Sequence, residues 1–297
     1  MENKSRIGHL CALVTIIVWG TTFIATKVLL EVFNPVEILF VRAVLALITL
    51  YVICPQPMKG TTLKQELTFA GAGFCGIFLY YVLQNVSLTY TLASNAGVIV
   101  SVAPFFTVIL SHFFLKEEGK IKARFLLGFV VAMVGIFLIS FNGAKMQLNP
   151  LGDVLVLISA FVWAIYSILT KNISSYGYST VMTTRKMFVY GTIFLIPCWW
   201  IFDCKLGLER FADPKVIFYF LFLGVGASAL CFVSWNYALK VLGAVKTSVY
   251  IYLDPVVTVV MSVLILREKI TLLSGIGTVM ALAGLLLSEG KPGKKEE

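Results

Sequence analysis

The sequence predicts an all-α polytopic membrane protein with ten transmembrane helices, arranged as two inverted repeats of five helices each. Three observations lead to this prediction. Hydrophobic residues make up 59% of the chain and charged residues only 13%, whereas soluble domains carry about 25% charged residues. Apolar runs of about 17 to 25 residues, the length that crosses a bilayer as helix, recur along the chain. Matched residues also recur at equal separations in the two halves.

We expect ten spans joined by short connections. They are residues 9–30, 35–54, 67–87, 94–115, 123–140, 151–170, 180–200, 215–239, 245–266 and 271–288. The first run is too long for the core of a signal peptide, so we expect it to be retained. A charged tail, residues 289–297, follows the last span.

The distribution of Lys and Arg predicts the orientation. With the N-terminus inside, fourteen of these residues fall on the cytoplasmic side and seven on the other side, as the positive-inside rule requires. We therefore expect both termini in the cytoplasm and the protein in the plasma membrane. The net charge of +9 does not indicate nucleic-acid binding, because the basic residues occupy short gaps between apolar runs.

The two halves share landmarks at identical separations. The matched pairs are Trp19 to Lys27 and Trp163 to Lys171, Asn85 to Pro104 and Asn236 to Pro255, Pro104 to Glu117 and Pro255 to Glu268, and Gly128 to Gly135 and Gly277 to Gly284. Each half holds five expected spans, an odd number, so the second half must enter the membrane from the opposite face. The predicted units are residues 9–140 and 151–288. Many transporters have this inverted repeat, although a duplicated scaffold without transport is an alternative.

Short motifs at corresponding places resemble those of the EamA family of the drug/metabolite transporter superfamily. They are VWGTTF in the first span, a Pro in the fourth, LKEE at the end of the fourth and LREK at the end of the ninth. The resemblance covers nearly the whole chain and implies a ten-helix permease that exports amino acids or other small metabolites. The second copy departs at Trp163-Ala164, where the first has Trp19-Gly20.

Polar and aromatic side chains form matched stripes at helical spacing. The stripes are Thr15, Trp19, Thr22 and Thr26 in the first span and Ser159, Trp163, Tyr166 and Thr170 in the sixth. A ligand-filled interior calls for such a face. Alternatively, Ser and Thr bond to nearby carbonyls or let helices pack closely.

The third and eighth spans add a further aromatic and amide lining. These residues are Tyr80, Tyr81, Gln84 and Asn85 in the third span and Ser228, Phe232, Trp235 and Asn236 in the eighth. We expect the two asparagines to cap helices or fix loops. The substrate-binding residues that we predict, all between the two repeats, are Trp19, Thr22, Tyr81, Trp163, Tyr166, Ser228, Trp235 and Tyr250.

Arg42 is a cation about seven residues inside its span. Three roles are open for it: binding a substrate carboxylate, pairing with Glu37, or binding carbonyls at a helix break. Lys27 and Arg185 lie nearer to span ends, where we expect long side chains to reach the membrane interface.

Asp254 is an acid near the middle of the ninth span, directly before Pro255. Its counterpart before Pro104 is Ala103, so the charge breaks the repeat. Asp254 is expected to couple transport to protons, to bind a substrate amine, or to be a structural acid held neutral by hydrogen bonding to Tyr250. Lys246, Tyr250, Asp254 and Thr258 follow one another at intervals of four residues, which predicts a single polar stripe on this helix.

Motifs for enzyme chemistry are absent from the sequence. There is no HExxH, no Walker-type phosphate loop and no GxSxG, and the six cysteines show no metal-binding spacing. We therefore expect a secondary transporter without catalytic residues, metal or cofactor. Its expected partners are a small-molecule metabolite and the lipid bilayer, with protons if transport is coupled. Both a monomer and a homodimer fit, and an intramembrane enzyme or a non-transporting scaffold is the alternative function.

Overall fold

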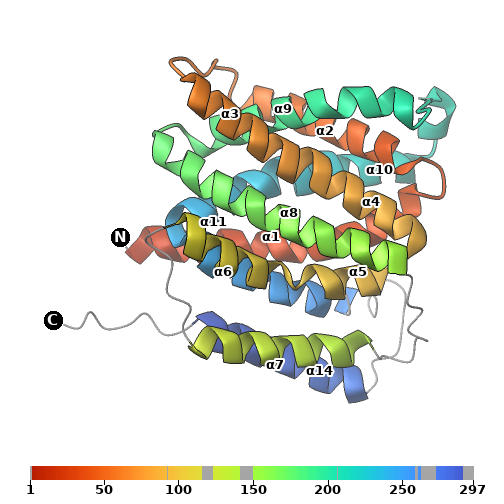
Figure 1. Cartoon of the computed structure of the whole chain (residues 1–297). Helices are drawn as coiled ribbons and strands as arrows, with labels where there is room; N and C mark the ends of the chain where they lie inside the picture. The colour runs from red at the N-terminus through yellow and green to blue at the C-terminus, as the bar shows by residue number, and fades with distance from the viewer. Residues whose placement is uncertain are drawn as a thin grey trace.

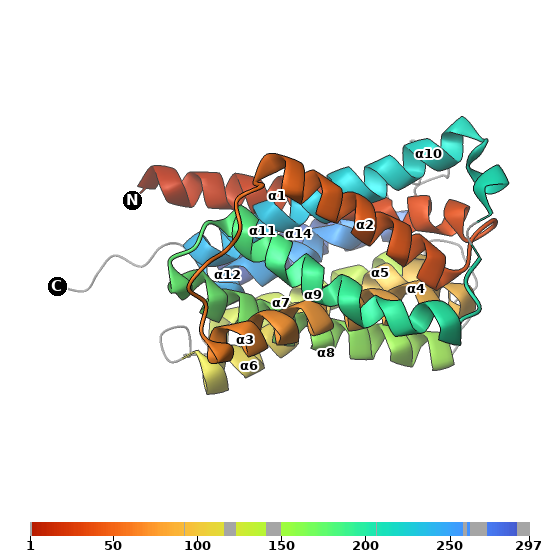
Figure 2. The ribbon, with the colours of Figure 1, turned by 90° about the horizontal axis from the view of Figure 1, so that it is seen from above.

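The structure is a computed structural model that describes residues 2–91, 93–115, 123–140, 150–205, 207–257, 260–261 and 272–289. Its described part consists of helices and connecting segments, without strands. The helices lie side by side along one direction, and the start of α1 and the end of α14 lie at the same end of the bundle (Figure 1). Figure 2 shows the same bundle from above.

The first half contains α1 to α7. Their bounds are α1 Glu2–Leu29, α2 Pro35–Ile53, α3 Leu63–Ala72, η1 Gly73–Leu79, α4 Tyr80–Tyr90, α5 Ala93–Val100, α6 Ala103–Phe114 and α7 Ala123–Ser140. The second half continues with α8 Pro150–Ile173, η2 Ser174–Tyr176, α9 Thr180–Ile201, η3 Leu208–Phe211, α10 Pro214–Leu221, η4 Phe222–Leu230, α11 Cys231–Leu242, α12 Ala244–Ser248, η5 Val249–Leu253 and α14 Leu272–Glu289.

Local sequence sets several helix ends. Asn34 caps α2 because its side chain accepts from the backbone N–H of Val36 and Glu37, while Glu37 accepts from the backbone N–H of Asn34. Pro35 follows at the first position of the helix, where its missing N–H costs nothing. Thr62 and Gln65 form the same reciprocal cap on α3.

Two long helices change their winding in the middle. Residues Gly73–Leu79 between α3 and α4, and residues Phe222–Leu230 between α10 and α11, are π-helical. Two other helical segments break just before a proline. α6 begins at Ala103, next to Pro104, and the 3-10 segment Val249–Leu253 ends at Asp254, next to Pro255. Proline removes a backbone donor, which explains why both breaks occur there.

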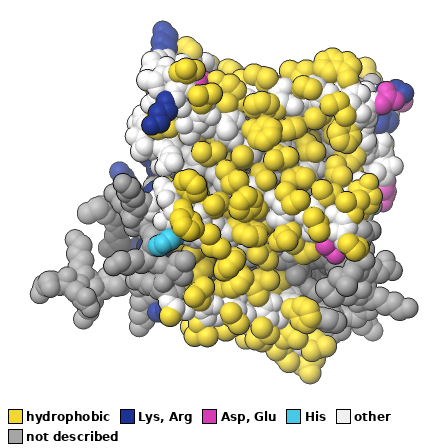
Figure 3. All heavy atoms as spheres, in the orientation of Figure 1, with side chains coloured by type: hydrophobic (Ala, Val, Ile, Leu, Met, Phe, Trp, Pro, Cys, Tyr) yellow, Lys and Arg dark blue, Asp and Glu magenta, His cyan; other side chains and the backbone are white. Residues whose placement is uncertain are grey.

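Five helical stretches of the described part are long and apolar enough to cross a membrane. They are Asn3–Leu29, Pro35–Ile53, Leu63–Tyr90, Pro150–Tyr176 and Pro214–Leu242. Hydrophobic side chains cover the middle of the face seen in Figure 3, and charged groups lie mostly toward its edges. The protein therefore has the surface and helix lengths of a multi-pass membrane protein.

α7 and α14 pack closely against each other at one side of the bundle (Figure 1). A Cβ atom added to Gly128 would lie 2.7 Å from the carbonyl oxygen of Gly284, and one added to Gly135 would lie 2.5 Å from that of Gly277. These glycines therefore bring the two backbones together.

Candidate functional site

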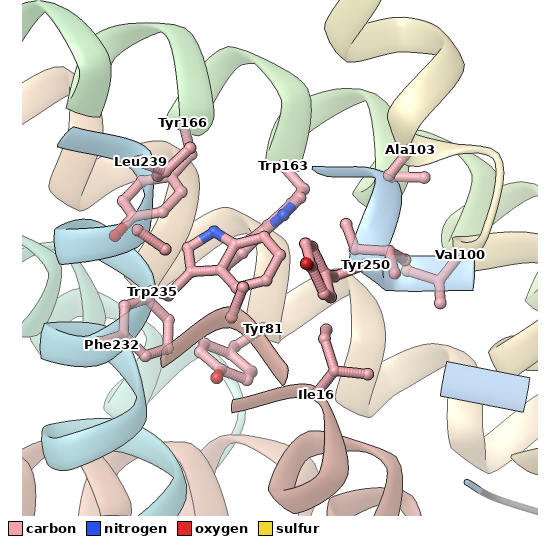
Figure 4. Packing of buried hydrophobic residues seen from close by; sticks show 14 of the residues in the cluster. Ile16, Tyr81, Val100, Ala103, Trp163, Tyr166, Phe232, Trp235, Leu239 and Tyr250 are labelled. Atoms are coloured by element: carbon pink, nitrogen blue, oxygen red, sulfur yellow. The ribbon is translucent and has the colours of Figure 1, made fainter. Parts of the chain in front are cut away.

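A cluster of aromatic rings lies at the centre of the bundle, around Trp19 of α1. Its ring centroid lies 5.2 Å from that of Trp163 on α8, 5.2 Å from that of Trp235 and 5.4 Å from that of Phe232 on α11. Figure 4 shows Trp163, Tyr166, Phe232 and Trp235 converging from these helices. Rings at such separations attract one another beyond their apolar burial, so the cluster joins α1, α8 and α11 firmly.

The polar stripe of α1 divides into two parts. Thr15 and the indole of Trp19 donate to backbone carbonyls of Cys231 and Ala227, at 3.4 and 2.9 Å. Ala227 lies in the π-helical segment η4. The first half of the stripe therefore fixes α1 to the η4 and α11 backbone, and the second half, Thr22 and Thr26, faces a cavity.

This cavity lies beside the aromatic cluster and has a volume of about 40 Å³. Its lining residues are Trp19, Thr22, Phe23, Thr26, Arg42, Tyr80, Tyr81, Gln84, Asn85, Leu88, Trp163 and Asp254. A cavity holds a water molecule once it offers roughly 10 to 15 Å³, whereas sites for organic ligands measure about 300 to 1,000 Å³. This cavity therefore has room for water but not for a metabolite.

Arg42 forms part of the cavity wall and is only 2% exposed. Its Nε donates to Ser228 Oγ at 2.9 Å, and its Nη2 donates to the hydroxyl of Tyr81 at 3.1 Å. The guanidinium carbon lies 4.1 Å from the centroid of the Tyr81 ring. The expected alternative of pairing with Glu37 is wrong, because Glu37 is held by Arg210 through Oε2 at 3.0 Å.

Asp254 enters the same cavity from the end of η5 and is 6% exposed. It packs against Gly20: a Cβ atom at that position would lie 3.2 Å from Asp254 Oδ1 and 2.7 Å from Val257 Cγ1. A larger residue would therefore collide with Val257 and crowd the acid. The two positions at which the repeats differ are therefore neighbours. Gly20, which corresponds to Ala164, packs against Asp254, which corresponds to Ala103.

The stripe predicted from Lys246 to Thr258 does not run along one face. The 3-10 winding of Val249–Leu253 changes the angle between successive side chains. Tyr250 bonds to His9 Nδ1 of α1 at 2.7 Å, whereas Asp254 lines the cavity. Thr258 lies outside the described residues.

Six of the ten residues singled out from the sequence line the cavity, and four lie outside its lining. The six are Trp19, Thr22, Arg42, Tyr81, Trp163 and Asp254. Of the four, Ser228 bonds to Arg42 and Tyr250 bonds to His9. Tyr166 and Trp235 pack against Trp163, with ring centroids 4.9 and 6.2 Å away. These four form a layer adjoining the lining.

Asn85 and Asn236 each connect their own helix to neighbouring segments. Asn236 accepts from the hydroxyl of Tyr166 at 2.6 Å and donates to Thr184 Oγ1 at 2.9 Å, so it joins α8, α9 and α11. The expected capping role is therefore wrong for Asn236. Asn85 donates to the carbonyl oxygen of Pro35 at 3.1 Å, which fixes the connection that leads into α2.

Lys27 is exposed in the last turn of α1, so its expected interface role stays a prediction, whereas Arg185 is buried. Lys27 Nζ donates to the carbonyl oxygen of Leu88 at 3.0 Å, at the end of α4. Arg185 is 5% exposed and donates to the carbonyls of Cys54 and Gln56, beyond the end of α2.

Sequence reasoning missed Phe23 and Leu88 among the lining residues. An apolar side chain on an apolar span has no contrast with its neighbours, so no pattern marked either of them. Tyr80 and Gln84 were noticed in the third span but not selected. Gln84 Oε1 accepts from Ser159 Oγ at 2.8 Å, so two polar residues from different spans meet at the cavity wall.

Comparisons with known proteins agree over the length of the chain. The profile of the EamA-like transporter family matches residues 6–141 and 150–289. An uncharacterized transporter of Archaeoglobus fulgidus is 28% identical, with 98% of this chain and 99% of the relative covered. A probable terminal-alkyne amino-acid exporter of Streptantibioticus cattleyicolor is 26% identical, with 92% of this chain and 90% of the relative covered.

One solved structure, described only as "Crystal structure of protein", superimposes with a TM-score of 0.75. It shares 15% sequence identity, with 96% of this chain and 97% of that chain covered. This likeness shows a common fold.

Proposed function

The chain belongs to the EamA-like transporter family, and on this premise we propose that it is a secondary transporter that exports small organic metabolites such as amino acids. The observation that carries the proposal is the central cavity, where aromatic rings, one buried arginine and one buried aspartate meet inside a membrane protein. The named amino-acid exporter among its relatives points to the same substrate class.

The proposed architecture is ten spans in two inverted repeats, residues 9–140 and 151–288, with both termini in the cytoplasm. Three observations support it. The family profile matches each half separately. The π-helical segments η1 and η4 interrupt the helices expected as the third and eighth spans. The helix breaks before Pro104 and at Asp254 occur in the fourth and ninth.

The proposed substrate is a zwitterion with an apolar part. Trp19, Tyr81 and Trp163 offer ring faces to the apolar part, and Thr22 offers a hydroxyl. Arg42 attracts a carboxylate, and Asp254 either binds an ammonium group or exchanges a proton during transport. Ser228, Tyr166, Trp235 and Tyr250 support this lining and become accessible if the cavity widens. A polyanion would need more converging cations than Arg42 alone provides.

Transport requires this small cavity to open toward one side and then toward the other. π-helical and proline-broken segments are the places where a helix changes its winding or direction at least cost. η1, η4 and the break at Asp254 all adjoin or supply cavity residues. We propose that these segments bend as the cavity alternates between the two sides.

Efflux from cells that overproduce the protein tests this function. Cells preloaded with labelled amino acids should lose at least one of them faster than cells that carry an inactive double variant, Trp19→Ala with Trp163→Ala. Both proteins must reach equal abundance in the plasma membrane. Equal efflux from the parent and the double variant, for every amino acid tried, would show that the proposed site does not bind the substrate.

Cysteine labelling tests the architecture independently. Single cysteines introduced in the connections 116–124 and 267–270, which lie largely outside the described residues, should be labelled from opposite sides of the membrane. Labelling of both from the same side would contradict an inverted repeat of five spans. The same experiment with a cysteine near the N-terminus places that end relative to the cytoplasm.

Asp254→Asn separates the open roles of the acid, because the amide keeps the size and hydrogen-bonding capacity but cannot titrate. If Asp254 couples transport to protons or binds an amine, efflux falls about tenfold or more, as expected from the loss of one charge-assisted interaction. A loss of pH dependence with intact substrate binding indicates coupling, and weaker binding indicates an amine site. Efflux and pH dependence equal to those of the parent would make Asp254 structural.

A further inference from the structure

Two buried N–H groups at the cavity wall have no hydrogen-bond acceptor among the described residues. One is Nε2 of Gln84, a residue that is 4% exposed. The other is Nε1 of Trp163, a residue that is 3% exposed. Both side chains line the cavity. A buried donor without an acceptor costs free energy, and native structures keep few of them. Two such donors in one small cavity therefore indicate an acceptor that binds there.

The contact with Ser159 fixes the direction of the Gln84 amide. Gln84 Oε1 accepts from Ser159 Oγ at 2.8 Å, so the other arm of the planar amide, Nε2, is directed away from α8. Ser159 is fully buried, and its single hydroxyl proton is shared between Gln84 Oε1 and the carbonyl oxygen of Val156, which lies 2.7 Å away in its own helix. Gln84 is thus a positioned donor.

A third source of donors stands at the same cavity. The hydrogen bonds of Arg42 to Ser228 and Tyr81 engage Nε and Nη2, and a guanidinium has five N–H groups in all. An amide N–H, an indole N–H and a guanidinium share one property: each gives hydrogen bonds and accepts none in this arrangement. The ligand group that suits all three is a carboxylate, which offers only acceptors and carries the opposite charge to Arg42.

We propose that Gln84 Nε2 and Trp163 Nε1 bind the carboxylate of the transported metabolite beside Arg42, and that these two residues select acids over their uncharged analogues. This inference rests on the proposed transport function. A site built to give hydrogen bonds rejects an analogue without the acceptor, because its own donors then stay unpaired. Asp254, on the same cavity, disfavours a ligand with net negative charge whenever it is ionised, so we expect the acid also to carry an amino group.

Transport by purified protein in liposomes tests the proposal, with L-phenylalanine, L-leucine and L-methionine as acids and their carboxamides as matched analogues. The amide replaces one acceptor oxygen by a donor and removes the negative charge. We expect the parent to transport at least one acid about tenfold better than its amide, judged by kcat/KM. Gln84→Met keeps the length of the side chain and removes both the Nε2 donor and the Oε1 acceptor, so it should lower acid transport about tenfold. Amide transport should fall by a clearly smaller factor, because the carboxamide has one acceptor oxygen and no negative charge.

Two further variants sharpen the assignment. Gln84→Glu puts a negative charge where the carboxylate would bind, so it should reverse the preference in favour of the amide, which carries a net positive charge. Trp163→Phe keeps an aromatic ring and removes the indole N–H, so it should reduce the preference for the acid by a smaller factor. Trp199→Phe is the matched control, because Trp199 lies outside the cavity lining, and it should leave the preference unchanged.

Each remaining outcome decides against the inference. If Gln84→Met lowers acid and amide transport equally, Gln84 is structural. If Gln84→Glu transports acids as well as the parent does, Nε2 does not face the substrate and the donors are satisfied by water alone. If the parent transports amides and acids equally, the protein is a transporter but does not recognise the carboxylate. If the parent transports none of the compounds, the proposed substrate class fails, and this inference fails with it.

Discussion

Arg42 and Arg185 are two buried arginines with different partners. They stand at similar places in the predicted repeats, since Arg42 follows Trp19 by 23 residues and Arg185 follows Trp163 by 22. Each is stacked over a tyrosine: the guanidinium carbon of Arg42 lies 4.1 Å from the Tyr81 ring, and that of Arg185 lies 4.6 Å from the Tyr51 ring. Arg42 gives its hydrogen bonds to the hydroxyls of Ser228 and Tyr81 at the cavity. Arg185 gives its hydrogen bonds to backbone carbonyls of Cys54 and Gln56.

The difference follows from what each arginine meets. Arg185 lies near the start of α9, beside the end of α2, where the last carbonyls of a helix have no partner within the helix and carry partial negative charge. Those carbonyls need a fixed donor, so Arg185 stabilises the fold. Arg42 lies within α2 and meets side-chain hydroxyls beside a cavity, where a ligand can take over part of its hydrogen bonding. In the transport function that we propose, the same residue type stabilises the fold in one half and forms part of the site in the other.

The largest expected effect is that of Arg42→Lys on transport. Lysine keeps the charge but loses the planar fork and the stacking over Tyr81. We expect the transport of amino acids, corrected for protein abundance, to fall about a hundredfold, equivalent to about 3 kcal/mol, because two charge-assisted hydrogen bonds are lost. The melting temperature in detergent should change little. Transport close to that of the parent would mean that Arg42 is as structural as Arg185.

Arg185→Lys should have the opposite profile. We expect the free energy of unfolding to fall by about 1 to 2 kcal/mol, because the carbonyls of Cys54 and Gln56, just beyond α2, lose part of their hydrogen bonding to the buried arginine. Thermal unfolding followed by tryptophan fluorescence measures this loss. Transport per folded molecule should stay within about twofold of the parent, which corresponds to less than about 0.5 kcal/mol. A selective loss of transport without a loss of stability would break the comparison.

Gly20→Ala gives α1 the residue that the second half has at the corresponding position, Ala164. The added methyl group would meet Val257 and Asp254, so we expect a destabilisation of about 1 to 3 kcal/mol and displacement of the acid. The additional change Val257→Ala should restore part of the stability, because it removes the closer contact. Equal stability of Gly20→Ala and the parent, measured by thermal unfolding, would show that α1 and the Asp254 helix are not packed as described.

Ser228→Ala is the smallest of these changes. It removes one acceptor from Arg42, at 2.9 Å from Nε, and should reduce transport by about three- to tenfold while stability changes by about 1 kcal/mol. Thr184→Ala is the matched control, since it removes a buried hydroxyl that bonds to Asn236 and not to Arg42. Equal effects of the two variants on transport would place Ser228 in the scaffold.

Several features of the site could be predicted because they depend on helical spacing. Trp19 and Thr22, and Trp163 in the matched stripe, were selected from their positions in the sequence, and all three line the cavity. Regular winding makes such predictions possible, since residues three or four apart share a face. Where the winding changes, spacing is a poorer guide: Tyr250, in the 3-10 segment before Asp254, bonds to His9 and is not among the lining residues.

The sequence by itself determined the helical membrane class, the family, and the presence of one acid and one arginine within apolar spans, because composition and local spacing carry these properties. Only the tertiary structure decided which polar groups meet. It joined Arg42 to Ser228, Glu37 to Arg210 and Gln84 to Ser159, pairs that lie 186, 173 and 75 residues apart. The physical reason is that hydrogen bonds act over about 3 Å between groups whose separation along the chain carries no information, so packing alone selects the partners.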